Sequence, residues 1–202
     1  EVIMSLLKGE DTLAVMPTSK GKTLCYQSAA LCSEGITIVI TPLRALCEDQ
    51  IVKFNKNYCD NFLRDEEAYK AYCNTQMGRL YNGALPMAAA PGLYGYYGDS
   101  FFNELATSDI ASREKGKNIV YKLLYLSPER LNRGKFYLSL MNTVKSGRIH
   151  INSIIVDEVH CLSQWSYDFR PSYLNLCSFL DLYEKATGIR LLRAGFTATA
   201  TQ

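Results

Sequence analysis

The chain has 202 residues, 48% of them hydrophobic and 21% charged, which is the composition of an ordinary globular protein with a sizeable core. Its formal net charge of +2 gives no reason to expect a polyanionic partner, although a local basic or aromatic patch could still bind one. No apolar run is long enough to span a membrane and no signal-peptide pattern opens the chain, so we expect neither a membrane-spanning nor a secreted protein.

The seven cysteines argue against a disulfide scaffold. They are odd in number and form no C-x-x-C pair. The chain also has only two histidines that could complete a metal site. Cys25, Cys32 and Cys47 stand among apolar residues and are predicted to be buried thiols, as in an intracellular protein. We therefore expect neither disulfides nor a zinc site.

Short apolar strands alternate with helical segments over the first fifty residues. In chain order the pattern predicts a helix from Val2 to Leu7, a strand at Leu13–Met16, a helix at Lys22–Cys32, a strand at Ile36–Ile40, and a helix that starts at Pro42 and runs through Ile51. This alternation is typical of βαβ units. It predicts an α/β fold with a mainly parallel sheet and helices on both faces.

The alternation breaks between Val52 and Asn118, where we predict an insertion or a long surface excursion. Within it, Met87–Asp99 is rich in glycine and tyrosine and shows no period of either kind. Its tyrosines could stack on nucleic-acid bases, but a loop packed on its own aromatic rings is favoured. Regular elements then return, with strands predicted at Tyr121–Leu126, Ile151–Val156 and Arg190–Phe196 and helices at Arg133–Ser146 and Ser172–Ala186.

A phosphate-binding loop is predicted at Met16–Thr23, which follows a strand and opens a helix. Backbone N–H groups and the helix N-terminus can surround phosphates there, and Gly21 keeps the backbone close to the anion. Lys22 would direct its charge at the β- and γ-phosphates, and the hydroxyl of Thr23 would hold Mg²⁺. Met16 stands where the strict pattern has glycine, so these eight residues alone fit a bland turn equally well. The residues predicted to bind ATP are Thr18, Ser19, Lys20, Gly21, Lys22 and Thr23.

An acidic pair completes the predicted site. The apolar strand ends in Asp157 and Glu158, and an open parallel sheet presents the carboxyl ends of its strands to ligands. Asp157 is predicted to hold Mg²⁺, and Glu158 to orient and deprotonate the water that attacks the γ-phosphorus. Alone, such a pair fits a solvated strand end. Together with the phosphate loop it predicts one site for Mg-ATP.

Six segments along the chain resemble, in order, the motifs of RecQ-family DNA helicases of superfamily 2. These are Met16–Gln27 (motif I), Thr41–Gln50 (Ia), Leu124–Leu131 (Ib), the DEAH-type Asp157–His160 (II), the aromatic-rich loop Cys161–Tyr173, and Phe196–Ala200 (III). The aromatic-rich loop is the most diagnostic, because it sets RecQ enzymes apart from other helicases of the superfamily. The resemblance covers nearly the whole chain outside residues 52–118.

The resemblance implies that residues 1–202 form the first RecA-like motor domain of an ATP-dependent DNA helicase that moves 3′ to 5′. It adds His160 to the predicted catalytic residues Lys22, Asp157 and Glu158. The residues that it implies for coupling DNA to the ATP site are Gln164, Trp165, Phe169, Arg170, Thr197 and Thr199.

The resemblance also implies cofactors, partners and a location. ATP and Mg²⁺ would be the cofactors. Single-stranded or partly duplex DNA would be the substrate, and a second RecA-like domain would follow Gln202 in cis. The expected location is the nucleus in a eukaryote, or the cytoplasm in association with the nucleoid in a bacterium.

Some residues depart from the family pattern. Ser19 and Lys20 stand where the family usually has glycines, and Ser166 and Tyr167 replace the usual Gly-His of the aromatic-rich loop. Trp165, the only tryptophan, would on its own be a core anchor rather than a DNA contact. Two other functions therefore stay open: a non-catalytic nucleic-acid-binding or scaffold protein that keeps the fold, and a small P-loop nucleotide kinase, against which the acidic box and the loop after it argue.

Overall fold

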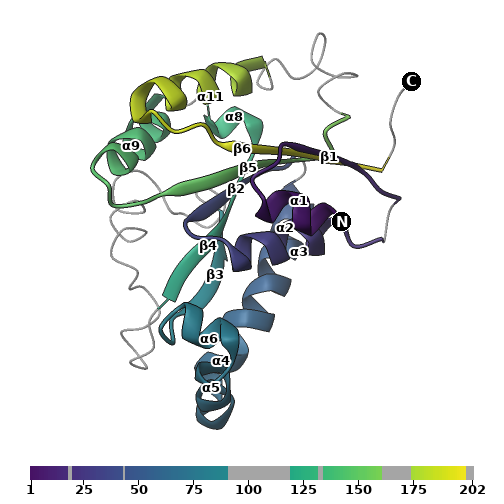
Figure 1. The fold of residues 1–202 in the computed structure, drawn as a ribbon, viewed down its shortest axis with the longest axis vertical. Helices are drawn as coiled ribbons and strands as arrows, with labels where there is room; N and C mark the ends of the chain where they lie inside the picture. Colours follow the sequence, from purple (N-terminus) through teal and green to yellow (C-terminus); the bar gives the residue numbers. More distant parts are fainter. Residues whose placement is uncertain (18–19, 43, 91–118, 132–133, 161–173, 199–202) are drawn as a thin grey trace.

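A six-stranded parallel sheet organises the protein (Figure 1). The computed structural model describes residues 1–17, 20–42, 44–90, 119–131, 134–160 and 174–198. The strand order is β1-β6-β5-β2-β4-β3, and all five neighbouring pairs are parallel. The strands are β1 (Thr12–Val15), β2 (Ile36–Ile40), β3 (Leu85–Ala89), β4 (Ile119–Leu126), β5 (Ile151–Asp157) and β6 (Leu192–Thr197). The predicted α/β class is confirmed.

Helices cover both faces of the sheet, as predicted. On one face the core includes side chains of α8 (Pro128–Leu131), α9 (Gly134–Lys145) and α11 (Leu174–Thr187). On the other it includes those of α1 (Val2–Leu7), α2 (Lys22–Cys32) and α3 (Arg44–Asn55). The central strand β2 serves both cores, because Ile38 and Ile40 face the first and Val39 faces the second. All five of its residues are buried, which explains why four of them are apolar and the strand does not alternate regularly between apolar and polar residues.

The turn into β2 depends on a glycine. Gly35 has a φ of +77°, and a Cβ built on it would lie 2.7 Å from the backbone oxygen of His150. A side chain at this position would be strained by both the left-handed backbone and the contact. The glycine thereby lets β2 begin beside the segment that leads into β5, where Ile36 N donates to His150 O at 2.8 Å.

The segment from Val52 differs from the predicted excursion, because it is regular as far as it is described, to Ala90. After α3 come a π-helical turn η1 (Lys56–Asp60), α4 (Asn61–Arg64), α5 (Glu66–Cys73), α6 (Gln76–Leu80) and the edge strand β3. These helices gather beside β3 at the end of the molecule far from α11 (Figure 1). They are too short for a clear helical period, and β3 contains Pro86, which a strand tolerates at the edge of a sheet. Of the Gly-Tyr stretch Met87–Asp99, residues 91–99 lie outside the described part of the chain.

The cysteines follow the prediction only in part. Cys47 is buried and Cys25 partly buried, but Cys32 is exposed, so its predicted burial is wrong. The reason is its place as the last residue of α2, beyond the buried run that ends at Leu31. Among the described helices, none combines the length and the apolar character that crossing a bilayer requires.

Candidate nucleotide-binding site

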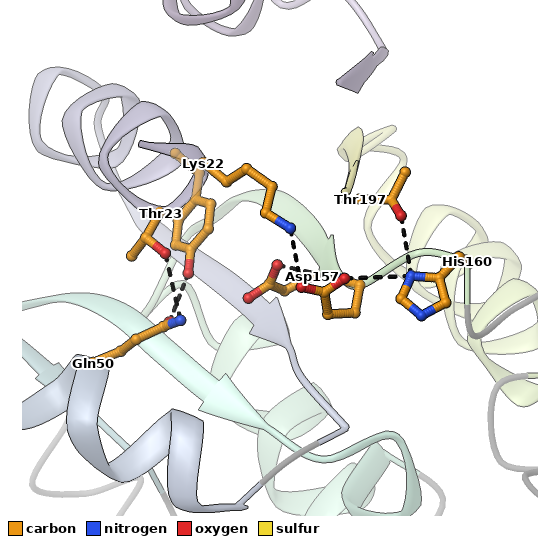
Figure 2. A network of polar contacts seen from close by, with 8 residues as sticks. Lys22, Thr23, Gln50, Asp157, His160 and Thr197 are labelled. Carbon is orange, nitrogen blue, oxygen red and sulfur yellow. Dashed lines mark hydrogen bonds and ion pairs between the residues drawn. The ribbon is translucent and has the colours of Figure 1, made fainter. Parts of the chain in front are cut away.

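The phosphate-loop residues and the acidic pair meet at the carboxyl edge of the sheet. Strand β6 lies between β1 and β5 and is hydrogen-bonded to a residue just past the end of each of them. Met16 N donates to Thr197 O at 2.9 Å, and Val159 N donates to Phe196 O at 2.8 Å. The parallel sheet therefore carries the loop after β1 and the carboxylates after β5 to one place (Figure 2).

Gly21 shapes the entry to α2. It is the N-cap residue, with a φ of +82° in the left-handed region, and its carbonyl accepts the N–H of Cys25 at 3.0 Å. A Cβ here would touch only Leu24, at 3.9 Å, so the backbone conformation rather than space favours glycine. Because glycine has no side chain to cap the helix, the first N–H groups of α2 are suited to an anion. Lys20, just before it, is exposed.

Lys22 joins the loop to the acidic pair. Its Nζ lies 3.0 Å from Oε1 of Glu158, an ion pair in which the two side chains are 11% and 23% exposed. Glu158 has a φ of +55°, which is uncommon outside glycine, and its N–H donates to Oδ1 of Asp157 at 3.0 Å. The strand thus ends in a tight turn that directs Glu158 at the base of α2, and residues 136 positions apart share one site.

Asp157 is a buried carboxylate, only 3% exposed. Burial raises its pKa above the usual range, and the nearby charge of Glu158 acts in the same direction. Lys22, the backbone N–H of Glu158 and a hydrogen bond from Gln50 oppose this rise. A cation bound at Asp157 would favour its ionised form in the same way as Lys22 does.

His160 connects the acidic pair to β6. Its Nδ1 lies 3.0 Å from Oγ1 of Thr197 and 3.3 Å from Oε2 of Glu158 (Figure 2). Thr197 is itself buried, at 3% exposure. A displacement of β6 would therefore reach the acidic pair through the histidine ring.

Two residues that the sequence did not single out for the site stand beneath the phosphate loop. The hydroxyl of Tyr26 donates to Oε1 of Gln50 at 2.7 Å, and Nε2 of Gln50 donates to Oγ1 of Thr23 at 3.4 Å. In the sequence, both are only members of motif-like segments. A signal for Gln50 was present, because it lies in the apolar stripe of α3 with Cys47, Ile51 and Phe54, where a polar residue needs a partner.

Several predicted site residues lie outside the described part of the chain, and their roles stay predictions. In the phosphate loop these are Thr18 and Ser19, and in the coupling set they are Gln164, Trp165, Phe169, Arg170 and Thr199. Of that coupling set, Thr197 is the member that the structure places, beside His160.

Comparison with known proteins shows similarity to helicases. Residues 1–83 match the DEAD/DEAH box helicase family. The chain is 31% identical over its whole length to ATP-dependent DNA helicase Q1 of Pongo abelii, covering 25% of that protein. Over 95% of its length it is 33% identical to ATP-dependent DNA helicase RecQ of Bacillus subtilis, again covering 25%. The chain thus spans about a quarter of the length of these curated relatives.

A solved structure supports the fold. The helicase Lhr of Mycobacterium smegmatis, determined bound to ssDNA and AMP-PNP, aligns with 98% of this chain and 22% of its own, with a TM-score of 0.58. Its sequence identity to this chain is 17%, so the likeness concerns the fold alone.

The match of residues 1–83 and the parallel sheet indicate a DEAD/DEAH box helicase domain as the class of protein. The class accounts for a phosphate loop and an acidic box at one edge of a parallel sheet. Within the class, the chain is similar to RecQ and Q1 helicases over its whole length rather than over motif I alone.

Proposed function

We propose that this chain is the ATP-binding motor domain of an ATP-dependent DNA helicase, which moves 3′ to 5′. The observation that carries the proposal is the 3.0 Å contact between Lys22 and Glu158, because it joins the phosphate loop to the acidic pair in one site. The names of the relatives, RecQ and Q1 ATP-dependent DNA helicases, support ATP as the nucleotide and DNA as the substrate.

The residues present fit ATP and Mg²⁺. A hydroxyl and a carboxylate, those of Thr23 and Asp157, are oxygen ligands of the kind that Mg²⁺ prefers, and the N-terminus of α2 suits a phosphate. When bound, Mg²⁺ neutralises charge that develops on the phosphate oxygens. Lys22 would exchange its bond to Glu158 for one to the phosphates. Glu158, released from Lys22, would then take a proton from the attacking water.

Coupling to DNA is proposed to run through motif III and the aromatic-rich loop. The contacts of His160 with Glu158 and Thr197 give β6 a direct connection to the acidic pair. The loop residues Gln164, Trp165, Phe169 and Arg170 follow the acidic box within ten positions, so a base stacked on them would be close to the ATP site along the chain.

The proposed partners are single-stranded or partly duplex DNA and a second RecA-like domain in cis. Residence with the DNA, in the nucleus or on the nucleoid, follows from that substrate. The nucleotide-kinase alternative has no support from the family match or from the relatives, which are named as helicases.

Strand displacement tests the proposal. The full-length protein should separate a partly duplex DNA only with ATP and Mg²⁺, and Lys22→Ala should abolish both separation and nucleotide binding, because the phosphates lose their point charge. Lys53→Ala, at an exposed lysine of α3 that pairs with Asp49, is the matched control. A wild-type protein that binds DNA but neither hydrolyses ATP nor separates strands would instead support the non-catalytic alternative.

A further inference from the structure

We propose that Gln50 is a positioning residue of the nucleotide site, which holds the hydroxyl of Thr23 in place for a divalent cation. The proposal deepens the proposed function and rests on it. Gln50 belongs to α3, whereas Thr23 opens α2, so the hydrogen bond between them ties two helices together directly beneath the phosphate loop (Figure 2).

The bonding of Gln50 fixes which way its amide points. Its Oε1 accepts the hydroxyl of Tyr26 at 2.7 Å, so Nε2 is directed at Oγ1 of Thr23, 3.4 Å away. The threonine oxygen has two lone pairs, and accepting one N–H leaves the other for a cation. The 3.4 Å distance is long for a hydrogen bond, and bonds of this kind often tighten when the ligand binds.

Tyr26 makes this orientation rigid. Its side chain is 1% exposed, and its ring packs edge-on against Phe196 at a centroid distance of 5.4 Å. Burial raises the pKa of Tyr26 well above its usual range, so the phenol stays protonated and able to donate to Gln50. The amide of Gln50 is thus held by a side chain that has little freedom to move.

Gln50 suits this position because its side chain is neutral. It meets the oxygen of Thr23 without adding a charge that would compete for the cation.

A buried amide needs hydrogen-bond partners, and those of Gln50 lie at the nucleotide site. Gln50 occupies the buried stripe of α3 and is 7% exposed, and an amide there costs free energy unless it is hydrogen-bonded. Asn55, on the same helix and 9% exposed, shows what a structural amide looks like. Within the described part of the chain it bonds the backbone of β3, donating to Ala88 O at 2.9 Å and accepting Ala88 N at 2.7 Å.

The magnesium dependence of ATP hydrolysis by the full-length protein tests the proposal. Gln50→Met keeps the length of the side chain and removes its hydrogen bonds, and it should raise the Mg²⁺ concentration at half-maximal hydrolysis about fivefold, the equivalent of one neutral hydrogen bond. Binding of a fluorescent ATP analogue in EDTA should not change. Tyr26→Phe keeps the ring and loses the hydroxyl, and should shift the Mg²⁺ midpoint in the same direction by a smaller factor.

Asn55→Leu is the matched control, since it also removes a buried amide from α3 but should lower the thermal midpoint without moving the Mg²⁺ midpoint. Equal Mg²⁺ midpoints for Gln50→Met and Asn55→Leu would overturn the proposal while leaving the helicase function intact. If Gln50→Met fails to fold, an unshifted midpoint in Tyr26→Phe overturns it. A wild-type protein without ATP hydrolysis would overturn the proposed function, and this proposal with it.

Discussion

Lys22 and Glu158 neutralise each other across the site, with 3.0 Å between Nζ and Oε1. Lysine must leave this pair to reach a phosphate, so the glutamate competes with the nucleotide for the same cation. The pair also keeps both side chains near the sheet edge, where 11% and 23% exposure leaves them accessible to a ligand. The contact is therefore consistent with a site in which the bond between Lys22 and Glu158 breaks when a nucleotide binds.

Glu158→Gln should separate binding from hydrolysis. The amide cannot act as a base, so hydrolysis should fall by roughly 10²- to 10⁴-fold. Nucleotide affinity should be kept or improved, because Lys22 loses its charged competitor. Titration with a fluorescent ATP analogue and a phosphate-release assay measure the two effects, with Glu10→Gln, at an exposed position, as control. Loss of affinity in Glu158→Gln would show that the carboxylate helps to build the pocket instead.

At the scale of elements, five of the six described strands were predictable, because each of these is a mainly apolar run bounded by turn residues. Helix α2 and strand β2 have the predicted bounds, and the other predicted strands are shifted by at most two residues at either end. The phosphate loop and the acidic pair follow the carboxyl ends of β1 and β5. Because parallel strands align these ends at one edge of the sheet, the meeting of the two segments was predictable as well. Local pattern was therefore sufficient for the fold class and for the location of the site.

The rest of the site could not be predicted, since it depends on contacts between distant residues. The bond of Lys22 to Glu158 and that of Gln50 to Thr23 require the packing of α2, α3 and β5, which no local period encodes. The left-handed conformation of Glu158 is another case, because a glutamate gives no local signal for it. Strand β3 could not be recognised because five residues with a proline resemble a loop.

Lys122 stabilises the junction between α2 and β2. Its ammonium donates to the carbonyl of Ser33, the C-cap of α2, and to that of Gly35 at 2.9 Å, and it lies 5.2 Å from the ring centre of Tyr81. A cation suits a helix C-terminus. The side chain is nevertheless 2% exposed, and burial lowers the pKa of Lys122 to about 8, although the charge of Glu34 acts in the opposite direction.

This pKa predicts a stability that depends on pH. Between pH 8 and 10.5 the unfolded chain binds a proton at Lys122 that the folded chain has lost, so the free energy of unfolding should rise with pH there. The free energy of unfolding should rise by about 3 kcal/mol over this range, and below pH 8 the contribution of Lys122 should not change with pH. Urea unfolding of wild type and Lys122→Met across this range measures it. The difference between the two free energies of unfolding removes the contribution of groups that titrate alike in both proteins. Lys53→Met, at an exposed lysine, is the control. Parallel curves for wild type and Lys122→Met would contradict the lowered pKa.

At the scale of the whole molecule, the described charged groups of the site all lie on one side of it. Its charged groups come from the carboxyl edge of a single sheet, namely the loop after β1 and the turn after β5. The chain also spans about a quarter of the length of RecQ and Q1 relatives. We expect the residues on the opposite side of the site, among them an arginine that stabilises the transition state, to come from the second RecA-like domain.

The 202-residue chain alone should therefore bind nucleotide weakly and hydrolyse it poorly. Arginines supplied across such a cleft contribute roughly 10³- to 10⁵-fold to turnover, so the chain should fall short of a two-domain protein by a factor of this order with single-stranded DNA present. Steady-state phosphate release by both proteins, at matched site concentration and saturating ATP, measures the difference. Circular dichroism establishes that the single domain is folded, and Lys22→Ala in each protein sets the background. Equal turnover by the two proteins would show that the cleft is complete without a partner domain, and would exclude a transition-state arginine from outside this chain.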